Sequence, residues 1–290
     1  MELVDVGIQI YGKPHQTAVT LLSLLKHSQK WIDKIYFIVE SRQPPGSDFS
    51  VLTSLLRDRL ITFTPKFYLG YGQTRFMLPW AFWKPLRHSF RYQYAWEHTN
   101  KNYLFLTHND VLYTDDCVGY FMKQIGSHIG VGQVGQCWNC PAKTAGKCDS
   151  TRYLEYRPDA EQFLQLLNGF KRCRGKRFYK KNFHRNVWPL PECRINEWAC
   201  LINMKQARAV TMPKGKCAPF GAFSVDIGTE WFHQVHQLGF TAAHADLSNY
   251  CKHAWASPTE NGHSADLNKD LYDHSEHLAK NLLKTDYGLF

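Results

Sequence analysis

Apolar and polar positions in the first part of the chain follow the alternation of short strands with amphipathic helices. Apolar or β-branched runs at residues 4–10, 35–39 and 60–63 have the length and composition of strands. Residues 17–27 carry apolar side chains at helical spacing, and residues 49–58 form a shorter candidate helix. Strands and helices in this order predict right-handed crossovers and a parallel sheet.

The remainder of the chain continues this pattern less regularly. No internal repeat and no low-complexity linker interrupts it, which favours a single α/β domain with an elaborated second half. The further elements that we expect, in chain order, are helices over residues 87–98, 115–125 and 159–170, a strand, alone or joined to a short helix, at 195–203, a helix that ends at Leu238 before Gly239, a strand at 240–247 and a helix over 267–284.

Residues 103–111 combine a strand of the buried type with an abruptly polar end. Residues 103–106 are apolar or aromatic without alternation, as in a central parallel strand whose two faces are both covered. Ligands of open α/β sheets bind at the carboxyl ends of the strands, where this strand would place His108, Asn109 and Asp110. The alternative is that these residues only turn the chain, and that Asp115 and Asp116 cap the next helix.

The composition is that of an ordinary globular protein, with 44% hydrophobic and 21% charged residues, but the charge is unbalanced. A net charge of +10 suits an anionic partner such as a nucleotide, nucleic acid, an acidic glycan or a membrane surface. Eight of the basic residues, and no acid, lie between Lys171 and Arg185, which favours either a docking surface or a solvated loop.

Two absences bear on where the protein is located. The N-terminus is acidic and leads directly into a strand, unlike a signal peptide. No apolar run reaches the about 18 residues of a membrane span. We therefore expect a cytoplasmic protein, in which the segment from Lys171 to Arg185 is the part able to contact a membrane surface.

Nine cysteines, an odd number in a chain of this size, indicate metal ligands or plain thiols in a reducing compartment. Three of them form a Cys-x2-Cys-x7-Cys pattern in a loop that contains Gly and Pro: Cys137, Cys140 and Cys148. Such a pattern fits a structural zinc site, for which Cys173 or Cys193 is the expected fourth ligand and His184 a weaker candidate. Free buried thiols are the alternative.

Several of these features together resemble the GT-A glycosyltransferases, particularly the family-2-like group. The features are a first strand followed by Tyr11-Gly12-Lys13-Pro14, a second strand that ends in Glu40, and the strand that ends in Asp110. The resemblance covers roughly residues 1–125 and, more loosely, residues 195–255. It implies one GT-A-like, Rossmann-like domain with a mostly parallel sheet, made of a nucleotide-binding half (1–125), a Cys-rich and basic insertion (126–194) and an acceptor-binding, catalytic half (195–290).

The resemblance also implies an activity, the metal-dependent transfer of a sugar from a nucleotide-diphosphate sugar to an acceptor hydroxyl such as that of a glycan. In this family an Asp-x-Asp motif at the strand end binds Mn²⁺ or Mg²⁺, which neutralises the diphosphate leaving group. The matching triplet here is His108-Asn109-Asp110, so that His108 replaces the usual first Asp. Donor contacts are implied for residues near this motif and in the first loops: Tyr11, Lys13, Glu40, Arg75 and Asn109.

The family pattern further places a general base ahead of a helix in the second half of the chain. Asp226 matches this position, with Glu230 as second candidate and Glu197 as third. A spacing of four would put Asp226 and Glu230 on one helix face, although Asp226 could also be a simple helix cap. The resemblance implies an inverting reaction. His253 matches a histidine that serves as a further metal or phosphate contact, while His244 and His263 are weaker candidates.

Three other functions are compatible with part of this pattern. A nucleic-acid-binding protein would explain the charge and a zinc site, but the basic run has only two aromatic residues and no recognisable readout module, so sequence-specific binding is not expected. A nucleotidyltransferase would need a Gly-rich basic loop after the first strand, where only one glycine stands. A catalytically inactive GT-A-like scaffold remains an alternative because of His108.

Overall fold

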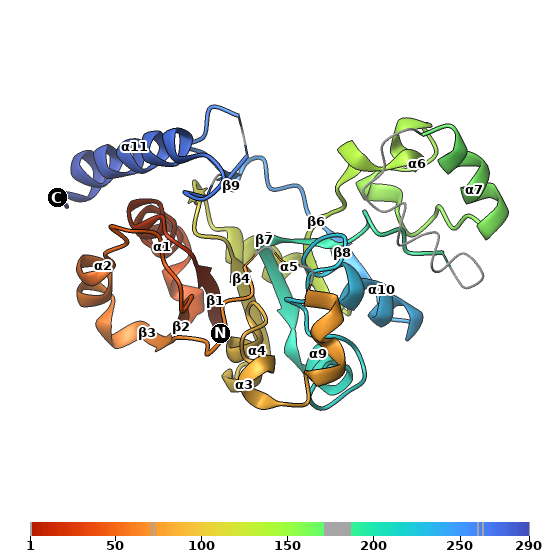
Figure 1. Cartoon of the computed structure of the whole chain (residues 1–290), viewed down its shortest axis with the longest axis horizontal. Helices are drawn as coiled ribbons and strands as arrows, with labels where there is room; N and C mark the ends of the chain where they lie inside the picture. The colour runs from red at the N-terminus through yellow and green to blue at the C-terminus, as the bar shows by residue number, and fades with distance from the viewer. Residues whose placement is uncertain are drawn as a thin grey trace.

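The computed structural model describes residues 2–70, 72, 74–170, 187–259, 261, 262 and 264–289. Its centre is a seven-stranded sheet in the order β3-β2-β1-β4-β7-β6-β8 (Figure 1). The strands are β1 (Val4–Ile10), β2 (Ile32–Val39), β3 (Leu60–Phe63), β4 (Tyr103–Thr107), β6 (Gly130–Val134), β7 (Ile195–Asn203) and β8 (Ala242–His244). Among these described strands only β7 runs antiparallel to its neighbours, which confirms the expected mostly parallel α/β sheet.

Helices cover both faces of the sheet (Figure 1). The described helices are α1 (Pro14–Ser28), α2 (Ser50–Leu55), α3 (Lys84–Arg87), α4 (Gln93–His98), α5 (Cys117–Gln124), α6 (Pro141–Thr144), α7 (Ala160–Asn168), α9 (Met204–Val210), α10 (Thr229–Gln237) and α11 (Lys269–Tyr287). Of these, α6 and α7 lie to one side of the sheet, at the upper right of Figure 1. In the part of the chain that the structure describes, no helix is long and apolar enough to cross a membrane.

The apolar strand β4 has no alternation because each of its faces enters a separate hydrophobic core. Leu104 and Leu106 belong to the core beneath α4, α9 and α10, whereas Phe105 belongs to the core beneath α1, α5 and α11. All three side chains are fully buried. Each Å² of buried apolar surface stabilises the fold by about 25 cal/mol, and β4 buries such surface on both faces. The strand therefore holds the residues that follow it in a defined position.

Two predicted elements need correction. The helix expected over residues 87–98 is divided into α3 and α4, because Tyr92 has a left-handed backbone with φ 62°. Strand β6 lies where the pattern predicts only the loop that carries the cysteines. Glycine has a low strand propensity, so the sequence pattern does not reveal this strand. The structure requires glycine at both positions, because a Cβ at Gly130 or Gly132 would lie 2.9 or 2.8 Å from the side chain of Ile195 on β7.

A small second sheet was not predicted and carries one of the candidate ligands. Strand β5 (Val111–Tyr113) pairs antiparallel with β9 (Cys251–His253), with Val111 opposite His253. Asp116 caps α5 by accepting a hydrogen bond from the Gly119 amide at 2.9 Å, and it also accepts from Ser28 and Trp31. Asp116 therefore has the structural role that the alternative reading gave it.

Candidate active site

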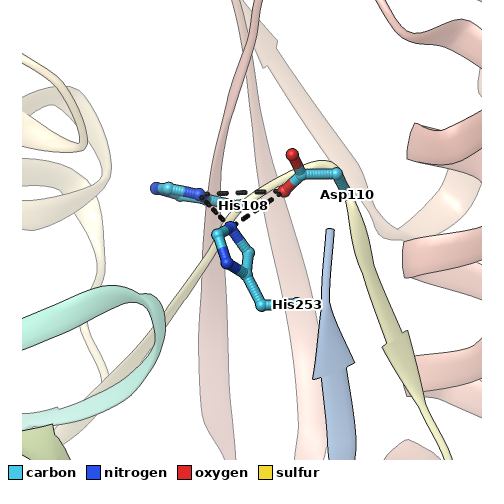
Figure 2. A group of neighbouring side chains, drawn as sticks. All are labelled: His108, Asp110 and His253. Carbon is cyan, nitrogen blue, oxygen red and sulfur yellow. Dashed lines mark hydrogen bonds and ion pairs between the residues drawn. The ribbon is translucent and has the colours of Figure 1, made fainter. Parts of the chain in front are cut away.

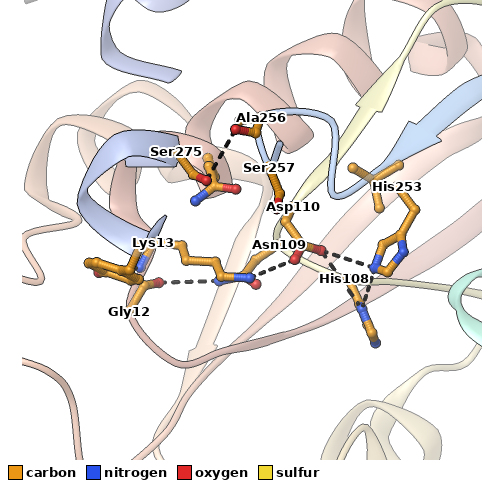
Figure 3. A network of polar contacts seen from close by, with 12 residues as sticks. Gly12, Lys13, His108, Asn109, Asp110, His253, Ala256, Ser257 and Ser275 are labelled. Carbon is orange, nitrogen blue, oxygen red and sulfur yellow. Dashed lines mark hydrogen bonds and ion pairs between the residues drawn. The ribbon is translucent and has the colours of Figure 1, made fainter. Parts of the chain in front are cut away.

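The carboxyl ends of β1 and β4 lie side by side in the sheet. The strand order reverses between them, because β2 and β3 follow β1 toward one edge of the sheet while β4 is the first strand toward the other edge. Crevices at such reversals are the usual ligand sites of open α/β sheets. Residues 11–13 follow β1, and residues 108–110 follow β4. The two loops are joined by a hydrogen bond from Asn109 Nδ2 to the Gly12 carbonyl at 3.2 Å (Figure 3).

A row of hydroxyl groups on α1 holds the segment after β4 in place. Thr17 and Thr20 accept hydrogen bonds from Asn109 Nδ2 and from the Val111 amide, at 3.2 and 3.0 Å. Ser23 accepts from the amide of Tyr113 at 3.1 Å. These side chains recur every third residue and so lie along one face of α1. Their burial among the apolar residues of α1 is explained by this role.

Three potential metal ligands converge in the crevice: His108 and Asp110 from the end of β4, and His253 from β9 (Figure 2). His108 Nδ1 lies 3.3 Å from His253 Nε2 and 3.8 Å from Asp110 Oδ1. His253 Nε2 lies 3.5 Å from the same Asp110 oxygen. Among the described residues, this is the one set in which three such atoms lie within 4.8 Å of one another.

The two carboxylate oxygens of Asp110 have different surroundings. Oδ2 accepts from Lys13 Nζ at 2.5 Å (Figure 3), whereas Oδ1 is buried without a hydrogen-bond partner and faces the two imidazoles. Burial opposes ionisation, but Lys13 and His253 outweigh it and hold the pKa of Asp110 well below its usual range. Asp110 is therefore an anion at neutral pH. An unsatisfied buried anionic oxygen beside two imidazole nitrogens fits a bound cation.

The spacing of the three ligand atoms also fits a divalent cation. Atoms about 2.0–2.2 Å from a shared ion lie about 2.8–3.6 Å apart in octahedral or tetrahedral geometry. The observed separations of 3.3, 3.5 and 3.8 Å require little movement. Two imidazoles and one carboxylate suit a transition-metal ion better than Mg²⁺, which prefers oxygen ligands.

Glu197 on β7 contacts the outer nitrogen of the His108 ring. His108 Nε2 lies 3.2 Å from Glu197 Oε1, and the other carboxylate oxygen accepts from Arg194 at 2.7 Å. Burial alone would raise the pKa of Glu197, but Arg194 and the His108 hydrogen bond hold it far below its usual range. With Nε2–H donated to Glu197, the inward Nδ1 of His108 is left with a lone pair, as a metal ligand requires.

Arg194 links this arrangement to Asp226. The guanidinium of Arg194 is buried and bonds Asp226 Oδ2 at 2.9 Å, and Gln136 also donates to this oxygen. The second oxygen, Oδ1, accepts from the Ile227 amide at 2.8 Å. Asp226 precedes α10, whose N-cap is Gly228, so the proposed common helix face with Glu230 does not form.

The crevice opens into a cleft with an empty volume of about 670 Å³. Predicted residues that line it are Tyr11, Lys13, Glu40, His108, Asn109, Asp110 and His253. Glu40 accepts from Gln9 at 2.8 Å through one oxygen, while its other oxygen is buried without a hydrogen-bond partner; burial raises the pKa of Glu40. Tyr11 stacks on Tyr68 with ring centroids 5.2 Å apart.

Four residues in the cleft wall were not predicted: Gln9, Arg91, Tyr92 and Gly262. A Cβ at Gly262 would lie 2.4 Å from Asp110 Oδ2, so only glycine permits this close approach. The helical pattern over residues 87–98 conceals the break at Tyr92, so no sequence signal marks Arg91 or Tyr92. Arg194 was missed as well, because nothing in a Pro- and Cys-containing loop marks an arginine that becomes buried.

The strained backbone positions of the chain gather around this cleft. Among the described non-glycine residues, Lys13, Tyr92 and Ala254 have positive φ values of 57°, 62° and 49°. Lys13 and Tyr92 line the cleft, and Ala254 follows His253 and donates its amide to the Asp110 carbonyl at 2.9 Å. Non-glycine residues in such conformations cost about 1–3 kcal/mol each and concentrate at functional sites.

Other predicted residues lie elsewhere. Arg75 and Glu230 form an ion pair at 3.7 Å and do not line the cleft. His244 Nδ1 accepts from the Val134 amide at 3.1 Å, away from the three ligands. Several predicted residues lie outside the described part of the chain, namely Cys173, His184, His263 and the basic segment from Lys171 to Arg185.

Comparisons with known proteins find distant structural likenesses. No family model and no curated protein sequence matches the chain. A mannosyltransferase, PcManGT from Pyrobaculum calidifontis, solved with GDP-mannose and Mn²⁺, is similar over 98% of this chain and 76% of its own, at 11% identity and a TM-score of 0.48. Glucosyl-3-phosphoglycerate synthase from Mycobacterium tuberculosis, solved with Mn²⁺, UDP and phosphoglyceric acid, is similar over 98% and 78%, at 10% identity and a TM-score of 0.44. Mouse xyloside xylosyltransferase 1 is similar over 85% and 86%, at 13% identity and a TM-score of 0.41. At these values the function proposed below rests on the side chains of the cleft.

Proposed function

We propose that this protein is a GT-A-like glycosyltransferase, which moves a sugar from a nucleotide-diphosphate donor to an acceptor hydroxyl with the help of a divalent cation. The observation that carries the proposal is Asp110 at the reversal of the sheet. One of its oxygens is paired with Lys13, and the other is unsatisfied and faces His108 and His253. A divalent cation held by Asp110 and the two imidazoles, beside the positive charge of Lys13, would suit the phosphates of such a donor.

The cleft offers separate contacts for the parts of a nucleotide donor. A cation at His108, Asp110 and His253 would act as a Lewis acid that stabilises the leaving diphosphate. Lys13 lies beside that position and adds a positive charge. Farther along the cleft, Tyr11 presents a ring for stacking and Glu40 an unpaired carboxylate oxygen, which suit a nucleobase or ribose.

Asp226 is the preferred base for the acceptor hydroxyl. Glu197 is held by Arg194 and His108 with a strongly lowered pKa, which makes it a poor proton acceptor and a good positioning residue for His108. Asp226 does not contact a cation ligand itself: it is hydrogen-bonded to Arg194, which in turn bonds Glu197 beside His108. Attack by a hydroxyl that Asp226 deprotonates would invert the anomeric centre, which proton NMR of the first product formed would establish.

The test is a thermal-shift screen of nucleoside diphosphates and sugar nucleotides with Mn²⁺, with Mg²⁺ and without a metal. We expect a melting-temperature rise for one base with Mn²⁺ and a smaller rise with Mg²⁺, because the ligand set contains two imidazoles. A hit should then show metal-dependent donor hydrolysis. No stabilisation by any nucleotide under any of these conditions would count against the transferase and favour an inactive scaffold.

Replacing Glu197 with glutamine is expected to weaken Mn²⁺ binding about 10–100-fold, because His108 loses the carboxylate that orients its ring. At saturating Mn²⁺ most of the transfer rate should return, since Glu197 is not one of the three proposed cation ligands. Calorimetric titration with Mn²⁺ measures the first effect, and rates over a range of Mn²⁺ concentrations measure the second.

The chain provides a matched control for this variant. Glu97 is a half-buried carboxylate that, like Glu197, is held by an arginine and a histidine, Arg87 at 2.7 Å and His88 at 3.1 Å, but it lies outside the cleft. Glu97→Gln should lower stability while leaving Mn²⁺ affinity unchanged. Equal losses of Mn²⁺ affinity in both variants would assign the effect of Glu197→Gln to general destabilisation.

A further inference from the structure

Four cysteines from separate turns line one small cavity, far along the chain from the cleft residues of β1 and β4. They are Cys137 in a 3-10 turn, Cys140 just before α6, Cys148 in the loop after α6, and Cys193 in the turn before β7. The hydrogen bond from the Cys140 amide to the Cys137 carbonyl, at 3.2 Å, closes the first turn. The structure thus brings Cys193 to the three thiols whose spacing already suggests a zinc site.

These four differ from the other described cysteines in their setting. Cys117, Cys200, Cys217 and Cys251 lie in helices, strands or a β-bridge, where a small apolar side chain is needed for packing. The cluster residues lie in turns instead, and all eight described thiols are free of disulfides. Four thiols that meet from irregular segments are the usual arrangement of a structural metal site.

We propose that Cys137, Cys140, Cys148 and Cys193 bind one structural Zn²⁺. Thiolate ligands lie about 2.3 Å from zinc, which places neighbouring sulfurs about 3.8 Å apart in a tetrahedron. No three of the four sulfurs lie within 4.8 Å of one another in the described structure, so at least two of them must move inward to bind the ion. The charged residues that line the same cavity are Lys143, Asp149 and Glu192, so the negative charge of four thiolates is offset by the zinc ion and by Lys143 alone.

The site would hold a segment on which the cleft depends. Elements around the cavity are short, since α6 has four residues and the flanking 3-10 turns three each. Cys193 directly precedes Arg194, which joins Glu197 to Asp226. Zinc would tie the turn before β7 to the Cys137–Cys148 loop and so fix the backbone that carries Arg194.

Metal analysis of the purified full-length protein tests this proposal. We expect about one zinc per chain, released by a thiol-modifying mercurial, and sulfur-to-metal charge-transfer bands after substitution with Co²⁺. Cys193→Ser should reduce bound zinc below half an equivalent. Cys217→Ser, which changes a buried cysteine outside the cluster, and Cys173→Ser should both retain it. Asp110→Asn should also retain it, because the cleft ligands form a different site.

Several results would overturn the zinc site. Wild-type protein that holds no zinc after incubation with Zn²⁺ would do so, as would disulfides among the four cysteines in non-reducing mass spectrometry. Loss of zinc in Asp110→Asn but not in Cys193→Ser would place the metal in the cleft instead. Loss in Cys173→Ser alone would exclude Cys193 as a ligand. None of these results depends on whether the protein transfers sugar.

A separate observation concerns the surface beside the cleft. Of the thirteen large hydrophobic side chains that are exposed in the described part of the chain, five lie within residues 76–83: Phe76, Met77, Trp80, Phe82 and Trp83. Phe76 and Phe82 are 74% and 77% exposed. Such a concentration on one short segment marks a contact surface, since scattered single residues are the ordinary case.

The backbone of residues 76–83 is held in place by packing and hydrogen bonds. Ala81 is fully buried against Phe90 and Ala222, so the exposed side chains project from an anchored backbone. The carbonyls of Ala81 and Phe82 accept hydrogen bonds from the buried Arg87 guanidinium at 3.0 and 2.9 Å. Backbone carbonyls that enter an apolar environment need hydrogen-bond donors, and these two carbonyls already have them.

The sequence around the segment is rich in lysine and arginine, although Arg75 is paired with Glu230 and Arg87 with Glu97. Residues 59–96 contain six lysines and arginines and no aspartate or glutamate. Lys66 Nζ lies 5.6 Å from the Trp83 ring centroid, and Lys84 follows Trp83 directly. Lys66, Lys84 and His88 also line a shallow cavity with an empty volume of about 550 Å³. Aromatic side chains flanked by lysines are typical of proteins that rest on anionic lipid surfaces.

We infer that residues 76–83 dock on an anionic lipid bilayer, with the aromatic rings at the headgroup level and Lys66 and Lys84 against the phosphates. Thr74, at the start of the segment, lines a small cavity that shares Glu40 and Arg91 with the cleft. Docking here would bring the cleft close to the membrane surface.

Co-sedimentation with vesicles tests this inference without donor or acceptor. The full-length protein should bind vesicles of phosphatidylcholine and phosphatidylglycerol in equal parts much more strongly than phosphatidylcholine alone. Phe76→Ser/Phe82→Ser should weaken this binding about 10-fold or more. Leu238→Ser/Leu267→Ser, which removes two exposed leucines elsewhere, should not. Unchanged binding by the phenylalanine variant would overturn the inference, as would binding of this surface only to soluble glycans or to a second copy of the chain.

Discussion

Replacing Asp110 with asparagine is expected to lower sugar transfer and donor hydrolysis about 10³-fold or more while the protein stays folded. Asp110 is the only one of the three cation ligands that carries a negative charge, and its free oxygen faces both imidazoles. An amide of the same shape removes most of the affinity for a divalent cation. A factor of 10³ corresponds to about 4 kcal/mol, within the several kcal/mol that a catalytic metal supplies.

The variant also changes stability, and this must be measured separately. Buried Lys13 loses its anionic partner, so a lower melting temperature is expected and rates should be compared well below it. Asp115→Asn is the matched control, because Asp115 is an exposed acid only five residues away. Wild-type rates in Asp110→Asn, or an unchanged Mn²⁺-dependent thermal shift, would exclude Asp110 as a metal ligand.

The site residues at strand ends could be predicted from the sequence because their position follows from the sheet. A continuous apolar run identifies β4 as a central strand, and a central parallel strand delivers the residues after it to the crevice. The same reasoning places Tyr11 after β1 and Glu40 after β2, and the structure brings both to the cleft wall with Asp110.

Residues that reach the site through other elements could not be derived in this way. His253 meets Asp110 only because β9 pairs with β5, across 145 residues from His108, and three-residue strands leave no clear pattern. Arg91 enters the cleft at the break between α3 and α4, which a helical pattern conceals. Local periodicity contains no information about such long-range pairings.

The separation of Asp226 from Glu230 has a similar cause. The sequence pattern is compatible with a helix that includes both carboxylates, but Gly228 adopts φ 79° and starts α10 after Asp226. Asp226 is thereby turned to Arg194, while Glu230 turns to Arg75. The two candidate bases therefore lie in different surroundings, which makes their roles separable by experiment.

Replacing Asp226 with asparagine is expected to lower the transfer rate about 10²-fold or more while leaving donor binding nearly intact. Loss of a general base affects the chemical step, and Asp226 is not among the residues that line the cleft assigned to the nucleotide. The Asp226 side chain is 16% exposed and Glu197 only 6%, so Asp226 is the more accessible of the two carboxylates bound to Arg194. Steady-state kinetics and donor titration measure the two effects.

The pH–rate profile and a control variant distinguish a base from a residue that only positions Arg194. The acidic limb of the pH–rate profile should disappear in Asp226→Asn, whereas a positioning role would lower the whole profile without changing its shape. Glu230→Gln is the matched control, because Glu230 lies four residues away and pairs with Arg75 instead. A larger rate loss in Glu230→Gln would move the base to Glu230, and a loss of donor binding alone in Asp226→Asn would assign Asp226 to the donor site.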